Sequence, residues 1–228
     1  MVSFAEIWRG LDWSILTDAL LRAVPALLCI TLHELCHGLV AYKLGDDTAK
    51  RAGRLTLNPL KHIDLIGLVM MLVFRFGWAK PVPVDMRRLR HPKRDMALVA
   101  LAGPVSNLLL SIVLLFLYGV LYIPLMSGKV GEVVLELLMT GGYLSCALAV
   151  FNMIPIPPLD GSKVLFSFFR DETYRKILRY ERYFMILLLV LVATRVLTGV
   201  LSTATGWLVD RLWVFAEWGF ALALKFVG

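Results

Sequence analysis

The chain has few charged residues. Only 18% of its 228 residues are Asp, Glu, Lys or Arg, whereas a soluble domain has about 25%. Hydrophobic residues make up 59% of the chain, against roughly 45–50% in soluble domains. One core of this size cannot hide that surplus, because a small domain leaves much of its surface exposed. The composition therefore excludes a soluble enzyme and a disordered chain, and it favours a protein embedded in a lipid bilayer.

Cysteine is scarce as well. The three cysteines, Cys29, Cys36 and Cys146, are scattered through apolar segments, and an odd, buried set of this kind does not build a disulfide framework. We do not expect the N-terminal segment to act as a cleavable signal peptide, because Glu6 and Asp12 interrupt it and no basic region precedes a short apolar run. We therefore expect the start of the chain to be retained.

The net charge of +7 would suggest a nucleic-acid partner in a soluble protein. Here the basic residues lie in the segments between apolar runs, where the cytoplasmic loops of membrane proteins carry them. No aromatic-interleaved basic patch lies outside those loops. We therefore expect no nucleic-acid partner, and we expect a multi-pass protein of the cell (inner) membrane.

The apolar stretches predict the fold class. A spanning helix needs about 20 apolar residues, and the stretch 65–78 is too short and is broken by glycines. The loops on its two sides are both basic, so the positive-inside rule makes it a re-entrant hairpin rather than a span. We expect an all-α polytopic membrane protein with about five to six transmembrane helices, forming a single domain over residues 1–228. The five expected spans are residues 14–42, 96–123, 137–159, 183–201 and 207–227.

A short cytoplasmic-side β element is expected as well. Residues 54–58 alternate between polar and apolar side chains, and Pro59 follows them. This pattern is typical of a strand that a proline ends.

The most informative motif is His33-Glu34-Leu35-Cys36-His37, which fits the pattern H-E-x-x-H. Residues four apart lie on one face of a helix, so both imidazoles can reach one Zn²⁺ while Glu34 lies beside them. Ionisable residues inside an apolar helix are costly and are functional candidates by default. The alternative is a polar cluster that hydrogen-bonds neighbouring helices.

A catalytic zinc site normally has three protein ligands and a water. The extended motif with a third histidine is absent, because Val40 and Lys43 occupy the relevant positions. Asp160 is the candidate third ligand, since it directly follows the expected span 137–159, at the same side of the membrane as His37. Spacing alone leaves two alternatives open: Asp160 is an ordinary Asp-Gly turn residue, or Cys36 coordinates the metal.

A second motif makes a family resemblance specific. His33-Glu34-x-x-His37 combined with Asn152-x-x-Pro155-x-x-x-x-Asp160-Gly161 resembles the site-2 protease family of intramembrane metalloproteases. The segments 53–59 and Ala102-Gly103-Pro104-x-x-Asn107 resemble its compact prokaryotic members, which carry no PDZ or CBS domain. The resemblance covers about residues 15–165.

The resemblance implies a set of roles. His33, His37 and Asp160 would be the zinc ligands, Glu34 the general base, and Asn152 a group that holds substrate or stabilises the oxyanion. The expected function is zinc-dependent hydrolysis of peptide bonds in or near transmembrane segments of membrane proteins. The competing hypothesis is a non-enzymatic metal transporter or sensor that uses the same cluster. The sequence names neither the substrate nor the oligomeric state.

Overall fold

The structure is a computed structural model, and it describes residues 13–64, 67 and 79–227. The expected re-entrant segment 65–78 lies almost entirely outside the described residues, so the prediction for it stays a prediction. The described part of the chain is helical and contains no strand. This confirms the all-α fold class.

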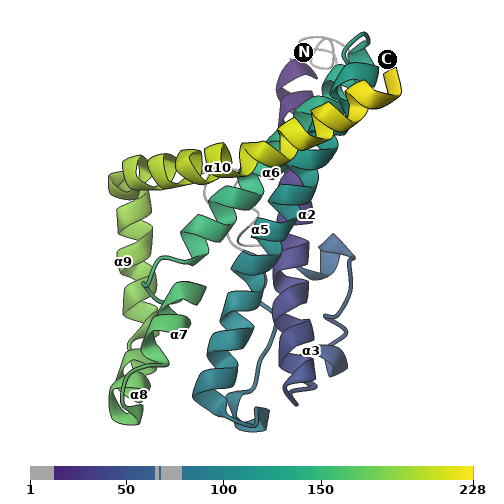
Figure 1. Cartoon of the computed structure of the whole chain (residues 1–228). Helices are drawn as coiled ribbons and strands as arrows, with labels where there is room; N and C mark the ends of the chain where they lie inside the picture. The colour runs from purple at the N-terminus through teal and green to yellow at the C-terminus, as the bar shows by residue number, and fades with distance from the viewer. Residues whose placement is uncertain (1–12, 65–66, 68–78, 228) are drawn as a thin grey trace, which may run out of the picture.

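Three long helices form the body of the molecule. They are α2 (Trp13–Lys43), α5 (Pro92–Leu125) and α6 (Lys129–Asn152), and they lie side by side with α5 between the other two (Figure 1). Each is long and apolar enough to cross a membrane. α2 and α5 coincide closely with the expected first and second spans, residues 14–42 and 96–123. α6 begins eight residues before the expected third span, residues 137–159, and ends at Asn152, because the prolines that follow cannot continue a helix.

The C-terminal part differs from the expectation. α9 (Glu181–Ala193) and α10 (Val196–Val227) meet at a bend of 80°. The break lies at Arg195, whose φ of 57° is left-handed, and α10 continues through Gly206, where a boundary between two spans was expected. The described helices provide three spans, or four if the bent pair counts as one. The expected count of five to six is therefore not confirmed.

Glycines let α10 pack closely across α5. A Cβ on Gly119 of α5 would lie 1.9 Å from the carbonyl oxygen of Ala216, and one on Gly219 of α10 would lie 2.3 Å from that of Phe116. Small residues allow two helix backbones to approach in this way. Side-chain hydrogen bonds join α5 to α6, since Ser111 Oγ donates to the Gly142 carbonyl at 2.9 Å and Ser145 Oγ donates to the Asn107 carbonyl at 2.7 Å.

The expected strand at residues 54–58 is absent. The segment is an irregular loop between α3 (Thr48–Arg51) and the 3₁₀ helix η1 (Pro59–Lys61). Its polar groups bond locally, since the Asn58 N–H donates to Thr56 Oγ1 and Asn58 Oδ1 accepts from the Leu60 N–H. Such bonds compete with a ladder to a partner strand. The described residues contain one isolated antiparallel bridge instead, between Ile63 and Ala79.

Shorter elements surround the lower half of the three long helices (Figure 1). The chain leaves α6 through the proline-rich segment 153–159 and enters α7 (Asp160–Phe166), which packs on α5. α8 (Asp171–Arg179) then leads into α9. On the other side, residues 79–85 run in irregular conformation to the 3₁₀ helix η2 (Met86–Arg88). These connections bring distant parts of the sequence to one face of α2.

Candidate metal and active site

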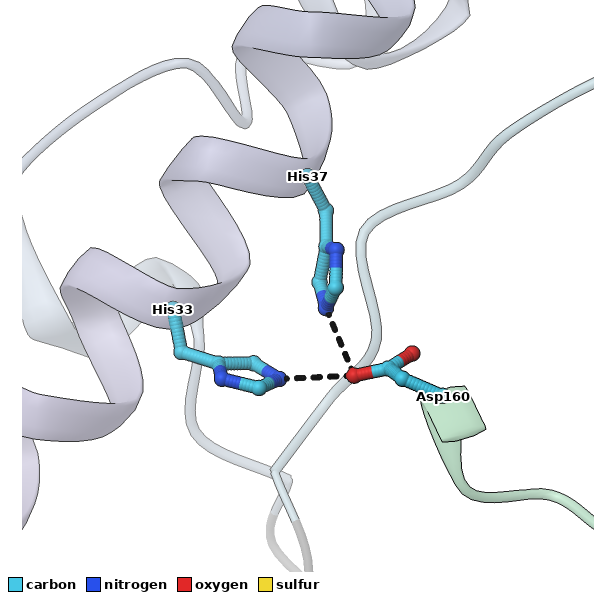
Figure 2. Close-up of side chains that lie close together, drawn as sticks. All are labelled: His33, His37 and Asp160. Atoms are coloured by element: carbon cyan, nitrogen blue, oxygen red, sulfur yellow. Dashed lines mark hydrogen bonds and ion pairs between the residues drawn. The ribbon is translucent and has the colours of Figure 1, made fainter. Parts of the chain in front are cut away.

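Three buried side chains converge between α2 and α7. His33 and His37 lie on one face of α2, and Asp160 is the first residue of α7. Figure 2 shows both imidazoles pointing at the same carboxylate oxygen: His33 Nε2 and His37 Nε2 each lie 3.1 Å from Asp160 Oδ2. The exposed fractions of the three residues are 6%, 9% and 5%. The structure therefore brings together the three residues that the sequence predicted as ligands of one metal ion.

The spacing suits a metal ion. The three ligand atoms all lie within 4.8 Å of one another. Two ligand atoms that each lie about 2.0–2.1 Å from a tetrahedral zinc are roughly 3.3 Å apart, close to the observed nitrogen–oxygen distances. Two imidazoles and a carboxylate are also donors that zinc prefers. The group among the described residues contains no cysteine, so Cys36 is not part of it.

The His37 ring is held in the tautomer that a metal needs. The His37 Nδ1–H donates to the Val99 carbonyl of α5 at 2.7 Å, and a carbonyl oxygen can only accept. When the ring is neutral, Nε2 carries the lone pair, and this is the atom that faces Asp160 Oδ2. His37 Nε2 and Asp160 would then both be able to hold a metal ion, and the bond to Val99 would be the outer hydrogen bond that metal-binding histidines generally make.

Asp160 is positioned by a tight turn. A Cβ on Gly161 would lie 2.2 Å from the Met153 carbonyl oxygen, so the glycine lets α7 start directly against the end of α6. Burial raises the pKa of the Asp160 carboxyl, but hydrogen bonds with His33 and His37 outweigh burial and hold that pKa well below its usual range. Asp160 is therefore a carboxylate at neutral pH, as a ligand must be.

Gly103 of α5 fits against both histidines. A Cβ at this position would lie 2.5 Å from His33 Cε1 and 2.5 Å from both Cε1 and Nε2 of His37. In the sequence, Gly103 stands out only as part of a family-like motif. Its position four residues before Asn107 places both residues on one face of α5, and that face meets α2 at the site. The i, i+4 spacing was the available signal for this role.

Glu34 lies beside the group and is fixed by the segment 79–85. The Val82 N–H donates to Glu34 Oε2 at 2.8 Å. This segment is held at both ends, because Arg54 donates to the Lys80 carbonyl and the Asp85 N–H donates to Asp46 Oδ2 at 2.7 Å. The backbone of a distant loop thus orients the carboxylate of the motif. No sequence pattern pointed to the contribution of Val82.

A cavity of about 470 Å³ opens at the site. Its lining includes His33, Glu34, His37 and Asp160 together with Asn152 at the end of α6. The Asn152 side-chain amide donates to the Leu148 carbonyl at 3.0 Å, and this bond does not use its amide oxygen. All the residues predicted from sequence therefore line one cavity. His62, in contrast, is buried elsewhere, with Nε2 at 3.0 Å from the Thr56 carbonyl oxygen.

Comparison with known proteins agrees with this geometry. The profile of the family described as peptidase family M50 matches residues 119–197, which include the second motif. YwhC of Bacillus subtilis (strain 168) is 40% identical over 177 residues, which are 75% of this chain and 79% of YwhC. The chain belongs to the site-2 protease family. Membership and the histidine–aspartate group make it a membrane metalloprotease.

More distant relatives support the same assignment. Rip2 of Mycolicibacterium smegmatis (strain ATCC 700084 / mc(2)155) is 29% identical over 81% of this chain and 71% of Rip2. MJ0611 of Methanocaldococcus jannaschii is 32% identical over 58% of this chain and 62% of MJ0611. These proteins and YwhC are named as zinc metalloproteases. No solved structure matches the chain.

Proposed function

We propose that this metalloprotease uses zinc to hydrolyse peptide bonds in or near the transmembrane segments of membrane proteins. The observation that carries the proposal is the convergence of His33 and His37 from α2 with Asp160 from α7, beside the carboxylate of Glu34. In this reading His33, His37 and Asp160 are the zinc ligands. His33 and His37 lie in the C-terminal half of α2, next to a basic loop that is expected in the cytoplasm, so substrates would reach the site from the bilayer or from its cytoplasmic surface.

Each remaining group has a role in the reaction. Bound zinc supplies Lewis acidity, which lowers the pKa of a water ligand and polarises the scissile carbonyl. Glu34 takes the proton from the attacking water, and its bond to the Val82 N–H keeps the carboxylate turned toward the cavity. Asn152 lines the cavity and can turn its amide to the developing oxyanion or to the substrate backbone.

The long apolar helices support a place in the cell (inner) membrane with the basic loops in the cytoplasm. A transmembrane helix hides its carbonyls in hydrogen bonds, so the substrate must unwind locally before Glu34 and the metal can act on it. The occupant of the cavity is therefore an extended stretch of a substrate chain, and the bilayer is the second partner.

Glu34→Gln tests the proposal against the transporter alternative. Glutamine keeps an oxygen that accepts the Val82 N–H, so the fold and the metal ligands stay in place. The experiment reconstitutes the full chain in liposomes with a single-span membrane protein labelled at both ends, and follows cleavage, zinc content and zinc flux. Retained zinc with cleavage reduced by about 10²–10⁴-fold or more is the expected result. Zinc flux that persists in Glu34→Gln, without cleavage by either protein, would establish the transporter instead.

A further inference from the structure

One buried polar side chain beside the metal ligands has no part in the reaction described above. Asn107 of α5 is completely buried, and its amide group contacts the ring of His33, with Asn107 Nδ2 at 3.2 Å from His33 Nδ1. Its Oδ1 has no hydrogen-bond partner among the described residues. A buried amide in a membrane interior is costly, so its contact with a single imidazole nitrogen calls for a reason.

The two ends of an asparagine amide are assigned rather than observed, and the hydrogen-bond network decides between them. With Nδ2 toward the ring, His33 Nδ1 accepts and Nε2 carries the proton, which leaves no lone pair for a metal. With Oδ1 toward the ring, His33 Nδ1–H donates to the amide and Nε2 presents its lone pair. In either orientation one end of the Asn107 amide lacks a partner, so hydrogen-bond counting does not distinguish them. The orientation is instead decided by the tautomer that His33 needs in order to bind a metal.

His37 shows which tautomer the site requires. Its Nδ1–H donates to the Val99 carbonyl, so Nε2, which faces Asp160 Oδ2, is the nitrogen available to bind a metal. His33 Nε2 faces the same oxygen at the same distance of 3.1 Å. If both histidines bind one ion through Nε2, both rings need an unprotonated Nε2. Histidine ligands generally gain it by donating their other N–H to a carbonyl, a carboxylate or a water.

We propose that Asn107 is the positioning residue for His33, with its Oδ1 accepting the His33 Nδ1–H so that Nε2 is free to bind zinc. This proposal rests on the proposed function, since it deepens the account of the metal site. Asn107 is itself fixed, because Ser145 Oγ donates to its backbone carbonyl at 2.7 Å and ties this turn of α5 to α6. Val99 and Asn107, both on α5, therefore have equivalent roles. Val99 accepts the Nδ1–H of His37 with its backbone oxygen, and Asn107 accepts that of His33 with its side-chain oxygen.

Zinc affinity tests the proposal without any substrate. The purified full chain and its variants are titrated with a chromophoric zinc chelator, and the thermal midpoint of each metal-free protein is measured beside it. Asn107→Asp keeps an oxygen that accepts the His33 N–H and offers no donor, so its zinc dissociation constant should stay close to that of the wild type. Asn107→Leu fills similar space without an acceptor and should bind zinc about 10- to 100-fold more weakly. Ser111→Ala, which removes another buried polar group from α5, is the matched control and should leave zinc affinity unchanged.

The possible results distinguish a failure of the role proposed for Asn107 from a failure of the proposed function. Asn107→Asp binding zinc as weakly as Asn107→Leu would overturn the acceptor role, and so would Asn107→Leu binding zinc as tightly as the wild type. If Asn107→Leu does not fold, Asn107→Asp decides alone. Failure of the wild type to bind zinc at all would instead contradict the proposed function, whatever the variants do.

Discussion

Gly103→Ala perturbs the site by a single methyl group. The new Cβ would lie 2.5 Å from atoms of both His33 and His37, whereas ordinary contact begins at 3.4 Å. Each ring, or the backbone of α5, must therefore retreat by about 1 Å, a displacement that matters because metal–ligand distances hold to about ±0.2 Å. Overpacking of this kind costs about 1–3 kcal/mol. If this cost falls only on the zinc-bound state, it corresponds to roughly a 5- to 150-fold loss of zinc affinity.

The assay compares Gly103→Ala with Gly206→Ala, both in the full chain purified in detergent. Gly206 lies in α10, and a Cβ there meets nothing within 4 Å. Alanine is the better helix former by about 0.5–1 kcal/mol, so Gly206→Ala should keep or slightly raise the thermal midpoint and should not change the zinc dissociation constant. Gly103→Ala should weaken zinc binding even where the metal-free protein stays folded. Equal zinc affinity in Gly103→Ala and the wild type would refute the packing argument.

Two further substitutions test how the site is held. Gly161→Ala places a Cβ 2.2 Å from the Met153 carbonyl oxygen, so it should push α7 and Asp160 away from α2 and lower zinc occupancy, measured by metal analysis; full occupancy would show that the tight turn is dispensable. Asp46→Ala removes a completely buried acceptor of bonds from the backbone and hydroxyl of Thr48 and from the Asp85 N–H. It should therefore reduce the free energy of unfolding by about 3 kcal/mol. Asp47→Ala, at the half-exposed neighbouring position, should change it by at most about 1 kcal/mol; equal effects of the two substitutions on the thermal midpoint would contradict the role of Asp46 as a buried acceptor.

The sequence predicted the chemically reactive residues of the site, but not the backbone groups that hold them in place. His33, Glu34 and His37 follow from helical periodicity, because a spacing of four residues places two imidazoles on one face whatever the rest of the fold does. Asp160 needed the second motif, since an Asp-Gly pair is also an ordinary turn. Val82 and Val99 were out of reach, because they act through backbone atoms whose partners depend on how distant segments pack.

The membrane topology was predicted less well, for physical reasons that can be named. Hydropathy located α2 and α5 well, since each has one continuous apolar run. It placed a boundary at Gly206, yet α10 passes through that residue and the break lies at Arg195, where the backbone is left-handed. Alternation at residues 54–58 suggested a strand, but Thr56 and Asn58 satisfy the local backbone instead. A two-residue period alone does not supply the partner strand that a ladder needs.

The identity of the zinc ligands is the most direct test of the account. X-ray absorption at the zinc edge of the purified chain reports the type and distance of the atoms bound to the metal. The account predicts only nitrogen and oxygen neighbours at about 2.0–2.2 Å, with the multiple-scattering pattern of two imidazoles. It also predicts loss of one oxygen neighbour, or of the zinc itself, in Asp160→Ala. A sulfur neighbour at about 2.3 Å would place Cys36 at the metal and contradict the site built from His33, His37 and Asp160.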